Sequence, residues 1–290
     1  ELCVSRGIGT CHTVYLRPKF DGEAKSEVGL VMEHCPGEYS SARYNVEKTR
    51  RNLELFQTIT SKFFDAHSQS ILIDVDAVTG NKTYKVVFEG NLPAEARDAV
   101  SGAIADLRHA LDMAMCATYE IVKGEAAPKH LYFPRGRSAE DVRGKLRKTE
   151  LPANVIDYLV SLQPHPTESQ NTIINNRLLC DLVTAAQSKH RIACALDANV
   201  EEVWIKATVK DAVSLSVPPR WDFEEQEAVL CTVGPQGHFE ANYSFALEII
   251  FVGAGPLTGW SVEQALLQLC DLCDTIILGL SLVSRENRAT

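Results

Sequence analysis

Two groups of residues have the types and spacing to hold an anion or to move a proton. Arg108 and Asp112 lie about one helical turn apart in the longest helical pattern of the chain, and the tripeptide Lys189-His190-Arg191 ends a later helical pattern. If the two groups meet, a carboxylate beside His190 would orient and charge its imidazole, and the cations around it would attract an anion. The candidate residues are Arg108, His109, Asp112, Lys189, His190 and Arg191.

Two interpretations of these residues compete. In the first, the charges tie two helices together and fix their register, as buried ionic networks do even where they add little net stability. In the second, the same charges bind a small anion, or Arg108 and His190 act as catalytic residues. An exposed pair with the cation on the N-terminal side contributes little, so Arg108 and Asp112 matter only if they are partly buried and hold a third group. We favour the structural interpretation, and the sequence leaves open whether the protein is an enzyme.

A helix predicted over residues 93–123 positions Arg108. Pro93 stands in the first turn, where no amide donor is needed, and Gly124 marks the end. Apolar residues recur every three or four positions between Ala96 and Thr118, with several alanines beside them, so a wide apolar face can pack closely on several partners. Such a helix is expected at the centre of the fold.

The other predicted elements are helical before residue 192 and mostly extended after it. Helical patterns cover residues 41–64, 138–148, 152–162, 171–189 and a last stretch from residue 261. Alternating patterns indicate a β-hairpin over 71–88 and strands near 192–196, 203–209, 228–233 and 239–252. We therefore expect an α+β protein, with a helical part around one long central helix, an N-terminal β-hairpin, and a C-terminal antiparallel sheet covered by the last helix.

The change of period near residue 192 indicates two domains. A helical domain with the hairpin would cover residues 41–191, and the sheet with the last helix would cover 192–286, although one continuous domain also fits the pattern. Met32 precedes the first well-formed helix and is interpreted as the natural start. On this interpretation, residues 1–31 are a non-native upstream extension.

Composition and charge favour a soluble cytoplasmic protein. The chain has 290 residues, a net charge of −9 and 45% hydrophobic residues, which argues against general nucleic-acid or anionic-membrane binding. Basic residues between Arg135 and Lys148 are interpreted as a solvated helix face. Nine cysteines, mostly among apolar neighbours, indicate reduced core residues, and neither a signal peptide nor a membrane span is predicted.

Several motifs in order resemble those of a widespread bacterial protein family of uncharacterised function. They are the stretch Leu107-Arg108-His109-Ala110-Leu111-Asp112, then Phe133-Pro134, Leu162-Gln163-Pro164 and Lys189-His190-Arg191. Members of that family read like LRSALDH, FPI, QPY and DKHR at similar spacings. The resemblance covers residues 43–195 and implies a bacterial cytosolic protein without a known activity. Met113 and Ser188 depart from the family pattern, where a histidine and an acidic residue are expected.

The relatives' arginine and histidine, five residues apart on one helix, also match the spacing of the HEPN ribonuclease motif. In that motif the arginine steadies a phosphate and the histidine moves a proton, without a metal. This chain has Met113 at the histidine position, so His190 or His109 would have to substitute across space. A metal-independent ribonuclease of a defence or toxin type, degenerate or active, is therefore the alternative, and RNA is a partner only under it.

Other chemistry finds less support in the residues. Cys270 and Cys273 have metal or redox spacing, but no second ligand pair follows, so core packing is expected, with no metal and no cofactor. His165, between two prolines, is interpreted as packing. We expect an interaction module or a small-ligand or anion-binding module. A homodimer is one arrangement that the long apolar helices would support.

Overall fold

The computed structural model describes most of the chain after residue 36. The described residues are 37–66, 69–88, 92–167, 174–185, 195–216, 221–222, 225, 227–252 and 257–288. The predicted upstream extension, residues 1–31, lies outside them, and so does the tripeptide Lys189-His190-Arg191. The α+β class that the sequence predicts is confirmed, with long helices and an antiparallel sheet.

Contacts divide the described residues into two compact units. The helical unit contains the described residues up to Ile59, those within Pro93–Leu196, and those from Phe251 onward. The sheet unit contains those within Thr60–Leu92 and Asp197–Ile250. This division differs from the boundary at residue 191 that the change of period indicates. The hairpin belongs with the sheet because its second strand pairs there, and the last helix belongs with the other helices.

Helix α2 (Ala94–Lys123) is the central element of the helical unit, and its predicted bounds are confirmed. Gly124, with a φ of 69°, ends the helix in the left-handed conformation that glycine adopts without strain, and its N–H donates to the Glu120 carbonyl. Ala103, Leu107 and Leu111 have no exposed surface. Helix α2 therefore supplies the middle of the core.

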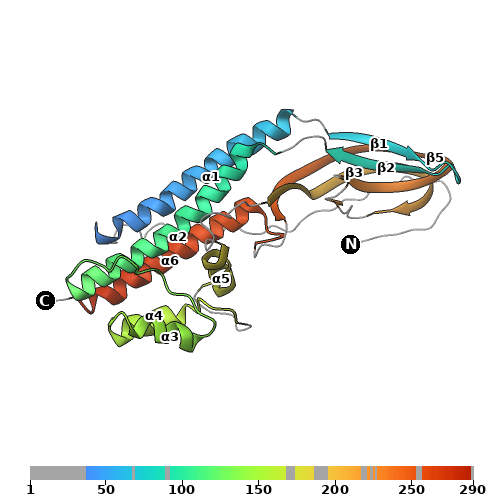
Figure 1. Ribbon diagram of the computed structural model, residues 1–290. Helices are drawn as coiled ribbons and strands as arrows, with labels where there is room; N and C mark the ends of the chain where they lie inside the picture. The colour runs from blue at the N-terminus through green and yellow to red at the C-terminus, as the bar shows by residue number, and fades with distance from the viewer. Residues whose placement is uncertain are drawn as a thin grey trace. The chain divides into compact units, whose positions relative to one another are not determined.

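Helices α1 (Ser40–Ala66) and α6 (Val262–Arg285) run beside α2 (Figure 1). The Thr49 hydroxyl on α1 donates to the Ala103 carbonyl on α2, 3.2 Å away, so these two helices approach closely. Helix α6 is long and apolar enough to cross a membrane by length and composition, but 56% of its most apolar window is buried inside the protein. That burial is what a core helix requires.

A chain of three buried hydroxyls fastens both ends of the helical unit to α2. The Tyr39 hydroxyl, at the end of the short helix η3 (Gly37–Tyr39), lies 2.8 Å from the Thr118 hydroxyl on α2 and 2.9 Å from the Ser284 hydroxyl on α6. Thr118 itself donates to the Ala114 carbonyl, so Tyr39 donates to Thr118. All three residues are fully buried, and the network satisfies polar groups that burial would otherwise penalise.

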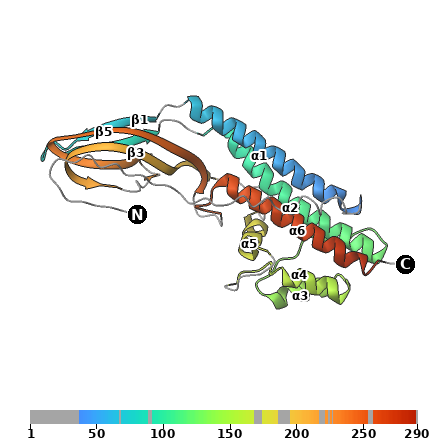
Figure 2. The same ribbon diagram turned by 180° about the vertical axis from the view of Figure 1, so that it is seen from behind.

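Three shorter helices complete this unit, namely α3 (Ala139–Arg147), α4 (Ala153–Ser161) and α5 (Asn176–Ala185). Helices α3 and α4 contact each other, and α4 also packs on α6 (Figure 2). Gly279 on α6 permits this approach, because a Cβ atom there would overlap the ring of Tyr158 on α4.

The sheet unit is built on a hairpin and two long strands. Strands β1 (Gln69–Val75) and β2 (Lys82–Phe88) form the predicted hairpin, and β2 pairs with β5 (Glu227–Val252), which in turn neighbours β3 (Ala195–Leu215). The pairs β1–β2, β2–β5 and β4–β5 are antiparallel, β4 being the short strand Trp221–Asp222. A bulge between Tyr84 and Lys85 leaves Leu230 as an extra residue on β5, so both Leu230 and Cys231 reach the buried side.

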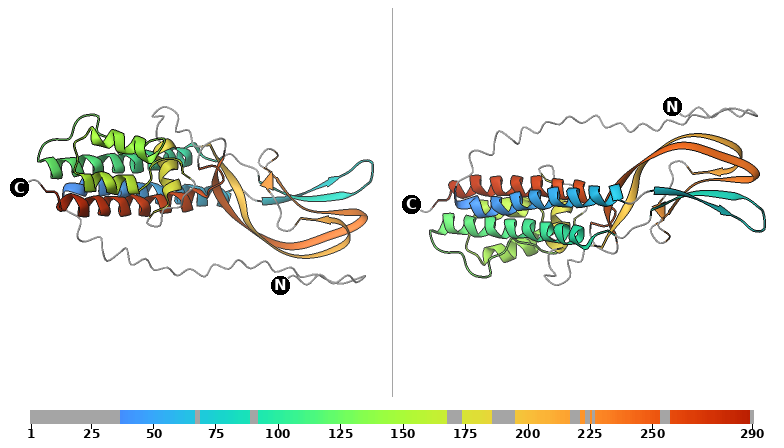
Figure 3. Two further views of the ribbon diagram at one scale, coloured as in Figure 1. Left: turned by 90° about the horizontal axis from the view of Figure 1, so that it is seen from below. Right: turned by 90° about the horizontal axis from the view of Figure 1, so that it is seen from above.

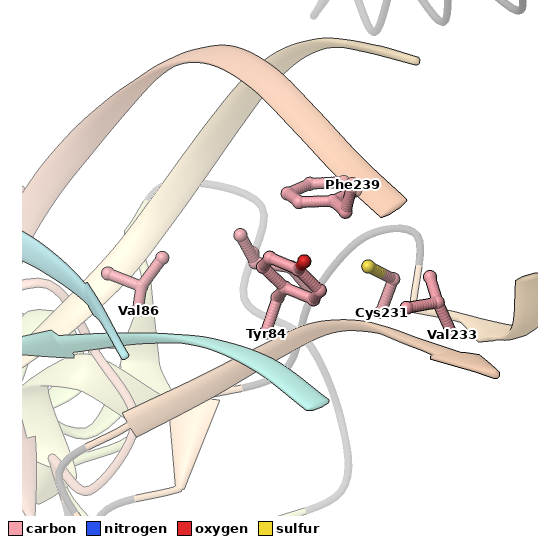
Figure 4. Close-up of a cluster of buried hydrophobic side chains, with 6 residues drawn as sticks. Tyr84, Val86, Cys231, Val233 and Phe239 are labelled. Atoms are coloured by element: carbon pink, nitrogen blue, oxygen red, sulfur yellow. The ribbon is translucent and has the colours of Figure 1, made fainter. Parts of the chain in front are cut away.

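One cluster of buried side chains packs on the described part of the sheet. Its buried side chains are Tyr84, Val86, Leu230, Cys231, Val233 and Phe239 (Figure 4). The rings of Tyr84 and Phe239 lie 4.9 Å apart at 53°, a tilted arrangement that aromatic pairs favour.

The sequence predicted several separate strands after residue 192, and the breaks between them are wrong. Two long strands, β3 and β5, run side by side and bend together (Figure 3), and the short β4 (Trp221–Asp222) lies between them in sequence. Gly234 and Pro235, in the predicted break between residues 233 and 239, lie inside β5. The missing side chain of Gly234 leaves room for the Asp211 carboxylate, so β3 and β5 remain neighbours through this stretch.

Candidate functional site

Arg108 and Asp112 on α2 form an ion pair and together hold the main chain of Phe133. The Arg108 Nη2 atom lies 3.0 Å from Asp112 Oδ1 and donates to the Phe133 carbonyl at 3.1 Å. Asp112 Oδ1 accepts from the Phe133 N–H at 2.8 Å. Both polar groups of one residue are thus satisfied by one pair, and the loop after α2 is fixed against the helix.

The Arg108 side chain is 17% exposed and that of Asp112 16%, so the pair is largely shielded from water. Burial lowers the pKa of Arg108, Asp112 opposes that effect, and the nearby Arg135 cation adds to it. The guanidinium stays charged in any case. Both a carboxylate, Asp112, and a second cation, Arg135, act on this positive charge.

One nitrogen of Arg108 has no partner. Nη1 is buried and makes no hydrogen bond, although Nη2 of the same group makes its contacts to Asp112 and Phe133. A buried donor without an acceptor, on a charged group, costs more free energy than a satisfied one contributes. Arg108 therefore has one donor that a bound acceptor would satisfy.

Arg135 lies in the loop that Arg108 holds. Its side chain is exposed, and its charge acts on Arg108 through the pKa effect described above. The next residue, Gly136, donates its N–H to the Pro164 carbonyl at 3.2 Å. A side chain at Gly136 would collide with Val142, so the loop needs glycine to lie this close to the start of α3. The loop after α2 is thus joined to the loop after α4.

His165 follows Pro164 and is 9% exposed. Its Nδ1 lies 3.2 Å from the Pro166 carbonyl, and its Nε2 is buried without a partner. The preceding Gln163 has a φ of 52°, unusual for a residue with a side chain, and its side-chain carbonyl accepts from Asn176 at 2.9 Å. Among the described residues, Arg108 Nη1 and His165 Nε2 are the two buried side-chain polar atoms without a hydrogen bond.

The structure brings together only part of the predicted cluster. Arg108 and Asp112 meet, whereas His109 is exposed on α2. Lys189, His190 and Arg191 lie outside the described residues, so the predicted convergence with Arg108 remains a prediction.

The burial of Arg135 and His165 agrees with their sequence interpretation. Arg135, interpreted as part of a solvated basic face, is exposed, and His165, interpreted as packing, is 9% exposed. The unpartnered Nε2 of His165 is the feature that the sequence did not indicate.

The described cysteines do not form a metal site. Within the part of the chain that the structure describes, no three histidine, cysteine or acidic side chains come together as metal ligands. Cys270 and Cys273 lie on the buried face of α6, and burial raises the pKa of Cys270 to about 12. Arg50 on α1 instead pairs with Asp274, their atoms 2.8 Å apart. This part of α6 serves packing.

Comparison of the chain with protein-family models, curated proteins and solved structures found no match. The resemblance to a bacterial family therefore stays a prediction from the ordered motifs.

Proposed function

We propose that the helical unit is a binding module for a small anion, held between the loop after α2 and the loop after α4. The observation that carries this proposal is the unpartnered Nη1 of Arg108. An oxyanion at this nitrogen would accept its hydrogen bond and offset a charge that Asp112 alone does not balance.

The local charge supports an anion rather than a cation. Two guanidinium groups, Arg108 and Arg135, act on each other here, and Asp112 is the carboxylate that pairs with Arg108. Because Nη2 fixes the guanidinium to Asp112 and Phe133, its orientation is set before a ligand arrives. A preorganised donor loses less conformational entropy on binding than a free surface arginine does.

The predicted pinning role and the proposed binding role are compatible, because they use different nitrogens. Nη2 holds the loop, and Nη1 is left for the ligand. This division makes Arg108 a poor single test, since its removal also frees Phe133. Arg135 offers a cleaner one.

The proposal is tested with Arg135→Gln. The side chain of Arg135 is exposed and makes no hydrogen bond or ion pair with the residues that the structure describes, so the variant should fold normally. We expect it to weaken phosphate binding, measured by titration calorimetry, about tenfold, the effect of losing one charge-assisted hydrogen bond.

Arg137→Gln is the matched control, since it removes an equally exposed arginine from the same loop and should leave binding unchanged. Equal weakening by both variants would show only general charge attraction. No phosphate binding by the wild type would refute the proposal, and cleavage of single-stranded RNA by the same samples would favour the ribonuclease alternative.

We also propose that the protein is cytoplasmic. Cys116, Cys180, Cys231, Cys270 and Cys273 are free thiols, which supports a reducing, cytoplasmic setting. A bacterial origin and a homodimer rest on the sequence alone.

A further inference from the structure

The second unpartnered atom, His165 Nε2, restricts what the anion can be. The bond from Gly136 to Pro164 joins the loops of Arg135 and His165. Adding standard bond lengths along this 3.2 Å bridge places the Cα atoms of those two residues within about 10 Å of each other. This separation is no longer than the reach of an arginine side chain to a small ligand, which is what a ligand shared by Arg135 and His165 requires.

The tautomer of His165 follows from its other nitrogen. Nδ1 lies 3.2 Å from the Pro166 carbonyl, and a carbonyl oxygen only accepts, so Nδ1 carries the hydrogen. In the neutral imidazole, Nε2 is then a lone-pair acceptor. It is buried and receives no donor from the protein.

The two unpartnered atoms therefore have opposite requirements. Arg108 Nη1 needs an acceptor, and His165 Nε2 needs a donor. We infer that the ligand is an oxyanion that also bears a hydroxyl donor, with hydrogenphosphate as its simplest representative. This inference rests on the anion-binding function proposed above and adds selection against fully deprotonated oxyanions.

Sulfate and phosphate are nearly the same size, so a comparison of their binding tests the need for a hydroxyl donor separately from the need for an oxyanion. At pH 8 phosphate retains one P–OH group, whereas sulfate has acceptor oxygens alone. Sulfate would place an oxygen lone pair against that of Nε2. A site with a buried unmatched polar atom rejects the ligand that leaves it unpaired.

The experiment is titration calorimetry at pH 8 with inorganic phosphate and inorganic sulfate. We expect wild-type protein to bind phosphate at least tenfold more tightly than sulfate. In His165→Gln the amide lies near the position of Nε2 and can turn either its oxygen or its nitrogen to the ligand, so the preference should fall to within about threefold. His109→Gln, which changes an exposed histidine on α2, is the control that should keep the full preference.

The outcomes distinguish failure of the anion-binding function from failure of the role of His165. Equal binding of both anions by the wild type, weakened in both cases by Arg135→Gln, would keep the anion-binding function and overturn the role of His165. A preference that survives in His165→Gln would also overturn that role. Absence of binding to either anion would overturn both.

A second measurement needs no variant. Nitrogen NMR of the wild-type imidazole should show a neutral ring protonated on Nδ1, and phosphate, but not sulfate, should shift the Nε2 resonance. A ring protonated on Nε2 in the free protein would overturn the inference.

Discussion

The two units differ in how they use buried surface. In the helical unit, α1, α2 and α6 bury whole faces, and several polar groups are buried with them, including the Tyr39 hydroxyl network and the Arg50–Asp274 pair. In the described part of the sheet unit, one cluster joins six buried side chains, and much of the hairpin is exposed, with Ile73 at 50% and Val78 at 93%.

This difference separates two roles that a core can have. A small core on a pleated surface stabilises a sheet but positions few functional groups. A large core of close helices can hold a partly unsatisfied charge, such as Arg108, because many surrounding contacts offset its cost. The candidate site accordingly lies in the unit whose described residues form the larger core.

The largest effect is expected from adjacent leucines on α6. Leu266 is fully buried and Leu267 is 48% exposed, so they differ in burial but not in residue type or helix. Leu266→Ala should lower the free energy of unfolding of the helical unit by about 2–5 kcal/mol, and Leu267→Ala by less than about 1 kcal/mol, in urea titrations. Equal losses would contradict a close-packed helical core.

A smaller effect is expected in the sheet unit. Val86 on β2 is 1% exposed, and Val75 on β1 is 62% exposed. Val86→Ala should cost about 2 kcal/mol, and Val75→Ala about 0.5 kcal/mol or less. Hydrogen exchange followed by mass spectrometry should place the loss from Val86→Ala in peptides of the sheet unit. Faster exchange throughout α2 would show that the two cores unfold as one.

The smallest effect is expected in the rate of thiol alkylation, compared between one cysteine of each unit. Burial raises the pKa of Cys231 to about 11 and that of Cys270 to about 12, both above the ordinary value of 9.0. Because thiolate is the reactive form, and a raised pKa lowers its fraction at every pH below that value, both should resist iodoacetamide at pH 8.

The half-buried Cys116 is the reference thiol and should be labelled first. As urea is added, we expect Cys231 to become reactive before Cys270, because the described cluster around Cys231 is smaller than the helical core around Cys270. The reverse order would remove the stability difference between the units.

Periodicity predicted the helices well because each has one buried face. The apolar positions of α2 and α6 recur at helical spacing, and burial follows them. Strand ends were predicted poorly, since Gly234 and Pro235 are turn residues by type but remain inside β5 next to Asp211. Whether the chain turns at Gly234 and Pro235 or continues as a strand depends on a neighbouring strand, which the local sequence does not specify.

The candidate site was only partly visible for a similar reason. Spacing alone identified Arg108 and Asp112 as a pair, but their common partner is the main chain of Phe133, and a backbone group has no signature in a sequence. The proximity of Arg135 and His165 depends on the bond from Gly136 to Pro164. No periodicity encodes a contact between two loops.

The hydroxyl network of Tyr39 has a topological consequence. Tyr39 and Ser284 are 245 positions apart in sequence, yet their hydroxyl oxygens lie 2.9 Å apart. Residues 37 and 288 can thus be joined by a short linker, and the chain can be opened instead at the exposed turn around Val78. We therefore expect that the fold does not require this order of elements along the chain. A circular permutant should reach the same packing of α1, α2 and α6.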